Sequence, residues 1–282
     1  MENQKVWFVT GASKGLGLSL VKQLLSAGYN VAATSRTVDS LSKAVGTEES
    51  ENFLPLEVSI TTEQSVKDAV SKTIEKFGTI DVLVNNAGYG LFGAVEELSD
   101  EETRRNFDIN VFGSLNVIRQ ILPYMRAKGS GKIFNISSIG GFTADFPGVG
   151  IYCSTKFAVA GFTEALASEV KELGISATVV YPGYFRTDFL SSESMVAPKN
   201  AIEDYAGARA SVQAHENEIA GNQPGDPQKA VAVLIKIASE ENTPVHLFLG
   251  KDSYEMAQGK IQTMTKNLEE YKAITVSTDF DS

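Results

Sequence analysis

The chain has 282 residues, of which 43% are hydrophobic and 21% are charged, and its formal net charge is −10. This composition is that of an ordinary globular protein and argues against extensive disorder. The negative charge argues against nucleic acid or an anionic membrane as the main partner.

Short apolar runs alternate along the chain with longer segments of helical apolar spacing. The runs predicted as strands are 5–10, 30–35, 52–58, 80–85, 131–137, 175–181 and 245–250. The segments predicted as helices are 15–28, 62–78, 100–129, 151–174, 226–241 and a last one near 252–272. Such alternation is typical of a parallel sheet covered by helices on both faces. We therefore predict an α/β fold of the Rossmann type, a doubly wound parallel sheet of about seven strands, in a single domain over residues 1–282.

Residues 188–225 form the least regular part of the chain and are rich in polar residues. We predict a mobile substrate lid in this segment. His215 lies in it and is expected to be a surface polar residue, whereas His246 begins an apolar strand and is expected to be structural.

Cysteine and histidine are scarce in this chain. Cys153 is the only cysteine, which excludes an intrachain disulfide, and there are two histidines. We therefore expect no metal site. The N-terminal residues lack the apolar stretch of a signal peptide, and no apolar run approaches the roughly 18 residues of a membrane span. We expect a cytoplasmic protein with neither a membrane nor a nucleic-acid partner.

A glycine-rich turn at residues 9–17 follows the first predicted strand and opens the first predicted helix. Gly11, Gly15 and Gly17 would let backbone amides approach a pyrophosphate at the helix N-terminus, where the helix dipole favours negative charge. The position between a strand and a helix favours a dinucleotide site over an ordinary glycine-rich turn.

Further motifs follow this turn in a fixed order. They are Asn-Asn-Ala-Gly at 85–88, Asn110 in the next helix, Asn-Ile-Ser-Ser at 135–138, Tyr-x-x-x-Lys at 152–156 and Pro-Gly-Tyr-Phe-Arg-Thr at 182–187. Together with the Thr-Gly-x-x-x-Gly-x-Gly spacing of the turn, this order resembles the classical short-chain dehydrogenase/reductase family. The resemblance covers about residues 5–190.

Tyr152 and Lys156 are four residues apart and therefore share one face of a helix. A tyrosine ordinarily has a pKa of about 10, and a cation beside it is expected to lower that pKa. The resemblance implies that Tyr152 is the general acid in ketone reduction and the general base in alcohol oxidation, while Lys156 also binds the nicotinamide ribose. It implies that Ser138, or less plausibly Ser137, bonds the substrate oxygen, and that Asn110 holds a water in a proton relay.

The resemblance also implies a nicotinamide cofactor. Ser35 and Arg36 end the second predicted strand, where an NAD enzyme generally has an acidic residue. A guanidinium suits a phosphate and Lys14 adds a second cation, so we expect NADP(H) to be preferred over NAD(H). The alternative is that both cations are solvated surface charges. The residues expected to bind the cofactor are Gly11, Ser13, Lys14, Gly15, Leu16, Gly17, Ser35, Arg36, Glu57, Val58, Asn86, Ala87, Gly88, Tyr152, Lys156, Pro182, Gly183 and Thr187.

Aromatic residues occur in the segments that flank the active site in this family. The expected substrate-binding residues are Ser138, Phe142, Phe146, Tyr184 and Phe189. Their rings favour a bulky apolar ketone, aldehyde or alcohol. The alternative to an enzyme is a regulatory protein that senses NADP(H) without turnover. Small residues along the helix at 152–173, together with the resemblance, favour a homodimer or homotetramer.

Overall fold

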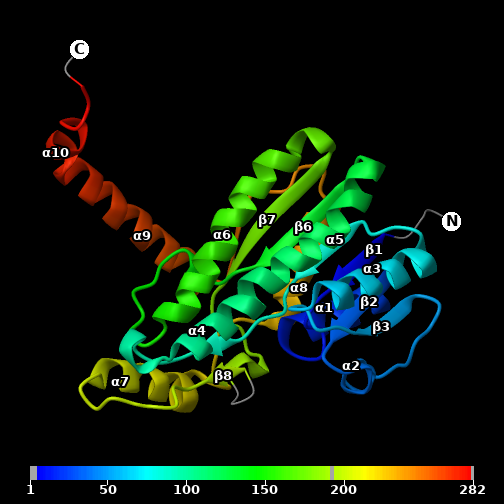
Figure 1. Cartoon of the computed structure of the whole chain (residues 1–282), viewed down its shortest axis with the longest axis horizontal. Helices are drawn as coiled ribbons and strands as arrows, with labels where there is room; N and C mark the ends of the chain where they lie inside the picture. The colour runs from blue at the N-terminus through cyan, green and yellow to red at the C-terminus, as the bar shows by residue number, and fades with distance from the viewer. Residues whose placement is uncertain (1–4, 191–193, 281–282) are drawn as a thin grey trace.

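The structure, a computed structural model, describes residues 5–190 and 194–280, and within them seven strands form one parallel sheet (Figure 1). The strand order is β3-β2-β1-β4-β6-β7-β9. The strands are β1 (Val6–Val9), β2 (Asn30–Ser35), β3 (Phe53–Glu57), β4 (Val82–Asn85), β6 (Gly131–Ile136), β7 (Ile175–Pro182) and β9 (His246–Leu249). Each lies in a run predicted as a strand, except that β7 extends one residue beyond its run, and the predicted fold class is confirmed.

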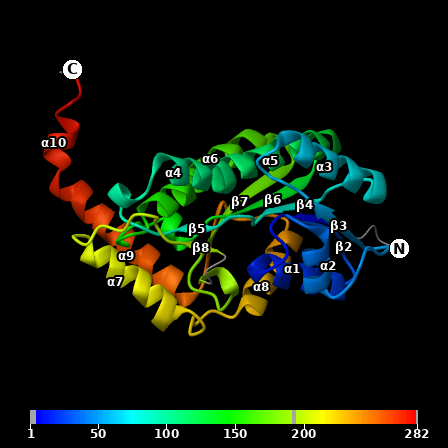
Figure 2. The same ribbon diagram turned by 60° about the horizontal axis from the view of Figure 1, so that its bottom comes forward.

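Two layers of helices cover the sheet (Figure 2). One layer consists of α1 (Gly15–Ser26), α2 (Val38–Val45) and α8 (Pro227–Ser239), and the other of α3 (Glu63–Phe77), α5 (Gly113–Lys128) and α6 (Gly150–Val170). The strand β1 shows why both layers are needed: Trp7 packs with the first layer, and its neighbour Phe8 packs with the second. Because successive strand residues point to opposite faces, a continuous apolar run requires cover on both sides.

The segment predicted as one helix over 100–129 is interrupted. It consists of α4 (Asp100–Phe107), a π-helical turn at Asp108–Phe112, and α5. In the π-helical turn the N–H of Gly113 bonds the carbonyl of Asp108, five residues earlier. Such turns are uncommon and often occur at functional sites.

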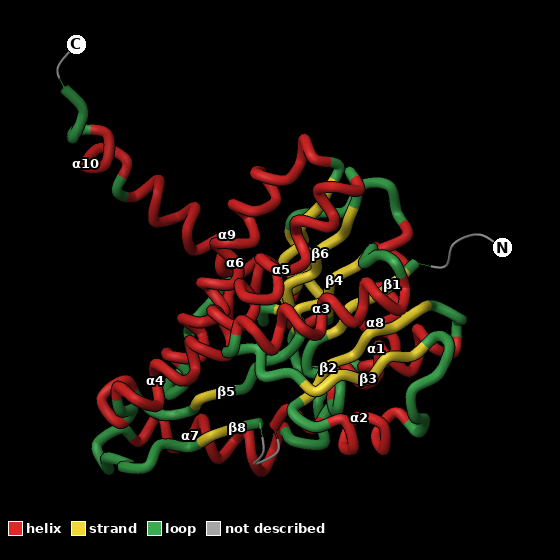
Figure 3. Tube along the Cα trace, turned by 45° about the vertical axis from the view of Figure 1, so that its right-hand side comes forward, coloured by secondary structure: helices red, strands yellow, loops and turns green. Residues whose placement is uncertain are grey.

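The segment 188–225 contains more regular structure than expected. It includes β8 (Met195–Val196), α7 (Ala206–Ala214) and a second π-helical turn at His215–Ile219. β8 pairs in parallel with the short strand β5 (Gly90–Leu91), apart from the main sheet (Figure 3).

A buried ion pair connects α7 to the segment before α4. The Glu97 carboxylate accepts hydrogen bonds from the Arg209 guanidinium and from the backbone N–H groups of Ala94 and Ile202. Its side chain is 1% exposed. The hydrogen bond from Arg209, more than any other contact, lowers the pKa of Glu97 from its ordinary 4.5 to about 2.

The C-terminal helix α9 (Lys251–Glu270) begins beside β9 and extends away from the rest of the molecule, followed by the short helix α10 (Lys272–Val276) (Figures 1 and 2). Its exposed apolar residues are Tyr254, Ile261, Met264 and Leu268. Among the helices within 5–190 and 194–280, none combines the length and apolarity needed to cross a bilayer.

We expect Arg209→Met to lower the free energy of unfolding by about 2–4 kcal/mol at pH 7, because it leaves the buried Glu97 carboxylate without its cation. Urea denaturation measures this. Since the pKa of Glu97 is lowered, the loss is full above about pH 4.5 and shrinks as the pH falls towards 2. The control is Arg104→Met, which breaks the exposed pair with Asp100 and should change stability little. Equal losses of unfolding free energy in both variants would contradict a stabilising, buried Glu97–Arg209 pair.

Candidate active site

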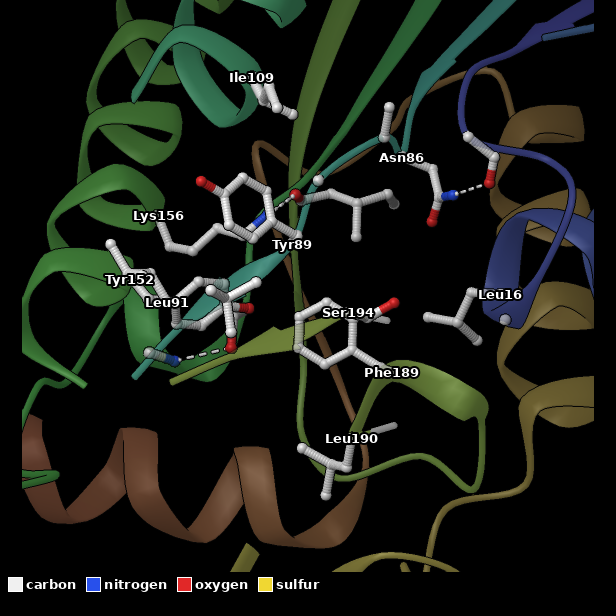
Figure 4. A pocket seen from close by; sticks show the side chains of 18 of the residues that line it. Leu16, Asn86, Tyr89, Leu91, Ile109, Tyr152, Lys156, Phe189, Leu190 and Ser194 are labelled. Carbon is white, nitrogen blue, oxygen red and sulfur yellow. Dashed lines mark hydrogen bonds between the residues drawn. The ribbon is translucent and has the colours of Figure 1, made fainter. Parts of the chain in front are cut away.

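A cavity of about 640 Å³ lies along the carboxyl ends of the central strands. The segments that follow β1, β2, β3, β4, β6 and β7 all contribute to its lining. This is where open parallel sheets bind ligands, and the volume is typical of a ligand site. In Figure 4, Tyr152 and Lys156 lie on one side of the cavity and Leu16 and Asn86 on the other.

The glycine-rich turn packs tightly against the end of β4. Gly11 has a φ of +64°, and a Cβ atom there would lie 2.7 Å from the Cα of Ala87. The Asn86 side-chain amide donates to the carbonyls of Thr10 (3.1 Å) and Gly11 (2.9 Å) (Figure 4). The turn is therefore held in a conformation that only glycine adopts readily, and it leads into the N-terminus of α1, whose first amides have no intrahelical acceptor.

Most of the residues expected to bind the cofactor line the cavity. They are Gly11, Ser13, Lys14, Gly15, Leu16, Ser35, Arg36, Val58, Asn86, Ala87, Gly88, Tyr152, Lys156, Pro182, Gly183 and Thr187. Gly17 and Glu57 do not line the cavity. Gly17 is a packing position, since a Cβ there would lie 2.5 Å from the Asn86 amide nitrogen. Glu57 is exposed at the end of β3, because strand alternation buries Val58 and turns Glu57 outward.

Tyr152 and Lys156 come from one face of α6 and are both buried, with 8% and 5% of their surface exposed. The Lys156 ammonium lies 5.7 Å from the centroid of the Tyr152 ring and donates a 3.0 Å hydrogen bond to the carbonyl of Ile136. The four-residue spacing on a helix therefore places the two side chains together, as the sequence predicted.

Burial controls the protonation of this pair. It raises the pKa of the Tyr152 hydroxyl above its usual range, against the opposing effect of a hydrogen bond with Ser138. It lowers the pKa of Lys156 to about 8. The sequence led us to expect a lowered pKa for Tyr152, and that expectation is wrong for this structure because loss of hydration outweighs the other effects. Near neutral pH Tyr152 therefore holds its proton.

The two serines after β6 have different surroundings. The Ser137 hydroxyl is buried and donates a 2.8 Å hydrogen bond to the carbonyl of Lys156. The Ser138 hydroxyl accepts a 3.0 Å hydrogen bond from the N–H of Gly140 and also bonds Tyr152. Ser137 is thus engaged in holding the loop against α6, while Ser138 is the one beside the Tyr152 hydroxyl.

Asn110 lies in the π-helical turn, does not line the cavity and is 1% exposed. Its side-chain oxygen accepts from the N–H of Tyr89, and its amide donates to the carbonyl of Tyr89 and to the hydroxyl of Thr155, each at 3.0 Å. A Cβ atom on Gly88 would lie 3.0 Å from the Asn110 oxygen and 3.6 Å from the Lys156 nitrogen. Asn110 therefore joins the π-helical turn to the segment after β4 and to α6, close to Lys156. Its role towards a water stays a prediction.

Four of the expected substrate-binding residues, Ser138, Phe146, Tyr184 and Phe189, line the cavity. Phe142 does not: its ring packs edge-on against Tyr181 and Phe248, at 5.7 and 5.1 Å between centroids. It is partly buried and packs against the core away from the cavity.

Sequence reasoning missed several residues that line the cavity. They include Tyr89, Leu91, Phe92, Leu190, Ser194 and Val196. Tyr89 directly follows the Asn-Asn-Ala-Gly motif, and that adjacency could have identified it. His215 was expected at the surface, but it is 8% exposed and lines the cavity. The turn after α7 brings its ring to 5.3 Å from that of Phe92, a long-range contact with no local sequence signal.

The fold and the cavity define a dinucleotide-binding α/β protein, with the glycine-rich turn at the carboxyl end of β1. A family model described as short chain dehydrogenase matches residues 5–196, and the chain belongs to this family. The resemblance drawn from the motifs is thereby confirmed.

Individual proteins show the same relationship. The chain is 37% identical to a 3-ketodihydrosphingosine reductase from Bacteroides thetaiotaomicron, with 87% of this chain and 88% of the relative aligned. The solved structure of a short-chain dehydrogenase from Streptomyces avermitilis superposes with a TM-score of 0.89 at 34% identity, covering 98% of this chain and all of the other. A structure described as ElxO with NADP bound superposes with a TM-score of 0.71 at 29% identity, covering 87% and 96% of the two chains.

We expect Gly11→Ala to lower the free energy of unfolding by about 2–4 kcal/mol, because alanine disfavours a positive φ and its methyl group would overlap the backbone of Ala87. The matched control is Gly259→Ala in the exposed interior of α9, where nothing lies within 4 Å. There alanine should raise stability by about 0.5–1 kcal/mol. Urea denaturation distinguishes the two, and a stable Gly11→Ala protein would contradict the tight packing of the turn.

Proposed function

We propose that this chain is an NADP(H)-dependent oxidoreductase that transfers a hydride between the nicotinamide and a carbonyl or secondary alcohol. The observation that carries the proposal is a single cavity lined both by the glycine-rich turn and by Tyr152, Ser138 and Lys156. A cofactor-sensing protein without turnover needs only the turn, so the buried tyrosine, serine and lysine in the same cavity favour the enzyme.

The residues around the cavity suit a dinucleotide. The turn has no side chain at Gly15, where only Thr187 lies within 4 Å of the Cβ position, and this leaves room for phosphates at the N-terminus of α1. Val58 and Ala87 offer apolar surface for the adenine side, Lys156 would bind the nicotinamide ribose, and Thr187 would bind the carboxamide. When bound, the nicotinamide supplies the hydride donor or acceptor.

The preference for NADP(H) rests on charge at the end of β2. Residues 34–37 include Arg36 and no acid, and both Arg36 and Lys14 line the cavity. An acidic residue at this strand end would bond a free ribose hydroxyl, whereas a guanidinium accommodates a phosphate. The bound NADP of the similar ElxO structure supports the same choice.

The side chains of this cavity can carry out the acid–base part of a ketone reduction. Tyr152, which holds its proton, would donate it to the carbonyl oxygen as the hydride reaches the carbon. Ser138, beside Tyr152, would hydrogen-bond the same oxygen and orient it. Lys156 would stabilise the phenolate that remains, because a cation in a site shielded from water acts strongly on a neighbouring negative charge.

We infer a bulky apolar ketone or aldehyde as the substrate. Leu91, Phe92, Phe146, Phe189 and Leu190 give the cavity an apolar wall. The relative from Bacteroides thetaiotaomicron is named as the reductase of a ketone, which supports a carbonyl substrate.

We also propose a homodimer or homotetramer in the cytoplasm. On α6, Gly161 and Ala165 are exposed, and nothing lies within 4 Å of the Cβ position of Gly161. This face can therefore accept the close approach of a second copy. Light scattering at micromolar concentration tests the assembly.

We expect NADPH oxidation with a panel of ketones and aldehydes, and a loss of about 10²–10⁴-fold in kcat in Tyr152→Phe, since the proton donor is removed. NADPH binding, followed by fluorescence, should change little. The control is Tyr124→Phe on the exposed surface of α5, which should retain full activity. No turnover by the native protein, with NADPH still bound tightly, would favour the sensing protein instead.

We expect Arg36→Ala to weaken NADPH binding about 10- to 100-fold and NADH binding much less, because only NADPH carries the phosphate that the guanidinium would bind. Fluorescence titration with each cofactor measures both affinities. Arg126→Ala, at the far end of α5, serves as the charge-matched control. An equal loss for the two cofactors would overturn the assignment of Arg36.

A further inference from the structure

His215 lines the cavity beside the apolar residues Phe92, Phe146 and Phe189. Its ring is buried, lies edge-on to Phe92, and lines the same cavity as Tyr152. The Tyr184 hydroxyl lies 3.0 Å from its Nε2 atom, and the carbonyl of Ser211 lies 2.7 Å from its Nδ1 atom. The catalytic scheme above uses neither Tyr184 nor His215, although both face the substrate.

The two contacts of His215 determine where the protons lie. A carbonyl oxygen can only accept, so Nδ1 carries a hydrogen and donates to Ser211. In the uncharged ring, Nε2 then has no hydrogen and must accept from the Tyr184 hydroxyl. The Tyr184 hydroxyl donates its only hydrogen in this bond. Towards the cavity it can therefore act only as an acceptor.

Tyr184 is held firmly in this orientation. Its backbone N–H donates a 2.6 Å hydrogen bond to the Asp252 carboxylate at the start of α9. That carboxylate fills the space beside Gly183, where a Cβ atom would lie 2.3 Å from both of its oxygens. The carbonyl of Tyr184 accepts a 3.0 Å hydrogen bond from the N–H of Gly225. The backbone of Tyr184 is therefore held at both its N–H and its carbonyl, and the hydroxyl by its contact with His215.

A second acceptor lines the same cavity. Gln223 is 2% exposed, and its side-chain oxygen has no hydrogen-bond donor among the residues that the structure describes. It lies two residues before Gly225, whose N–H bonds Tyr184. A buried acceptor without a donor is costly, but this oxygen exposes less than 1 Å², so a ligand can reach it only after the side chain rotates.

We infer that Tyr184, oriented by His215, forms an acceptor subsite that selects carbonyl substrates with a second, hydrogen-donating group such as a hydroxyl or an N–H. The inference rests on the proposed function for the identity of the reacting carbonyl. It adds that the substrate is amphipathic, since one polar donor must reach Tyr184 while the rest of the molecule lies against apolar walls. Tyr184 is a specificity residue in this scheme, and His215 is a positioning residue.

The test compares ligands that differ only in donating ability. The probes are the para-hydroxyphenyl and para-methoxyphenyl forms of one aryl butanone, and the meta-hydroxy and meta-methoxy forms of acetophenone. Calorimetry measures their binding to the protein with NADP⁺ and without it. We expect at least one hydroxyl form to bind about five- to tenfold more tightly than its methoxy partner, the effect of one hydrogen bond.

Variants separate the acceptor from the surrounding packing. Tyr184→Phe should bring the hydroxyl-to-methoxy ratio to about one. His215→Phe should also lower the ratio, because the freed Tyr184 hydroxyl can then donate to a methoxy oxygen. The matched control is Tyr181→Phe, which removes a similar tyrosine–histidine contact (3.2 Å to His246) outside the cavity and should leave the ratio unchanged.

The outcomes distinguish this inference from the proposed function. Equal binding of both forms in the native protein, a ratio that survives Tyr184→Phe, or a preference for the methoxy form would overturn the acceptor subsite. Turnover of ketones together with equal binding of the hydroxyl and methoxy forms would support the oxidoreductase and contradict the acceptor subsite. A preference for the hydroxyl form without any NADPH oxidation would support the acceptor subsite and contradict the oxidoreductase.

Discussion

The removal of a tyrosine and a lysine from water governs the organisation of this site. Burying an ammonium group is costly unless it is bonded, and here Lys156 donates to the carbonyl of Ile136 at the end of β6. That bond requires the loop after β6 to lie against α6. The glycine at position 141 permits this, since a Cβ there would lie 2.6 Å from the Lys156 carbonyl. The chemistry at Tyr152 therefore depends on a backbone contact between sheet and helix.

A buried chain of polar side chains maintains that contact. Asn85 at the end of β4 donates to Asn135 in β6, and Asn135 donates to Thr163 in α6, each at 2.9 Å. Asn110 adds the bond to Thr155 one turn after Tyr152. Buried networks of this kind favour one arrangement, because displacing a member leaves a further polar group without a partner, as the Asn85 side-chain oxygen already is among the described residues. Part of the motifs at 85–88, 135–138 and 152–156 thus serves to fix α6 on the sheet, and only part faces the cavity.

Sequence reasoning predicted the features that depend on local spacing. The strands follow from short apolar runs, the glycine-rich turn from its position before a helix, and the shared face of Tyr152 and Lys156 from helical periodicity. It failed where contacts between residues distant in the sequence determine the position of a side chain. Phe142 packs against the core because Tyr181 and Phe248 receive its ring, and His215 faces the cavity because α7 folds back over Phe92. The raised pKa of Tyr152 follows from burial, which no neighbouring residue in the sequence reports.

The two halves of the cavity are built by different means, and in the proposed function this separates cofactor binding from substrate choice. The cofactor side consists of turns fixed by the strand ends of the main sheet. The other half is lined in part by residues 194–223, which are joined to the rest through the β5–β8 pair and the Glu97–Arg209 ion pair. Because β5 begins two residues after the motif at 85–88, β8 is held next to that motif. Changes in α7 can therefore alter the substrate surface around His215 while the glycine-rich turn and Tyr152 keep their places.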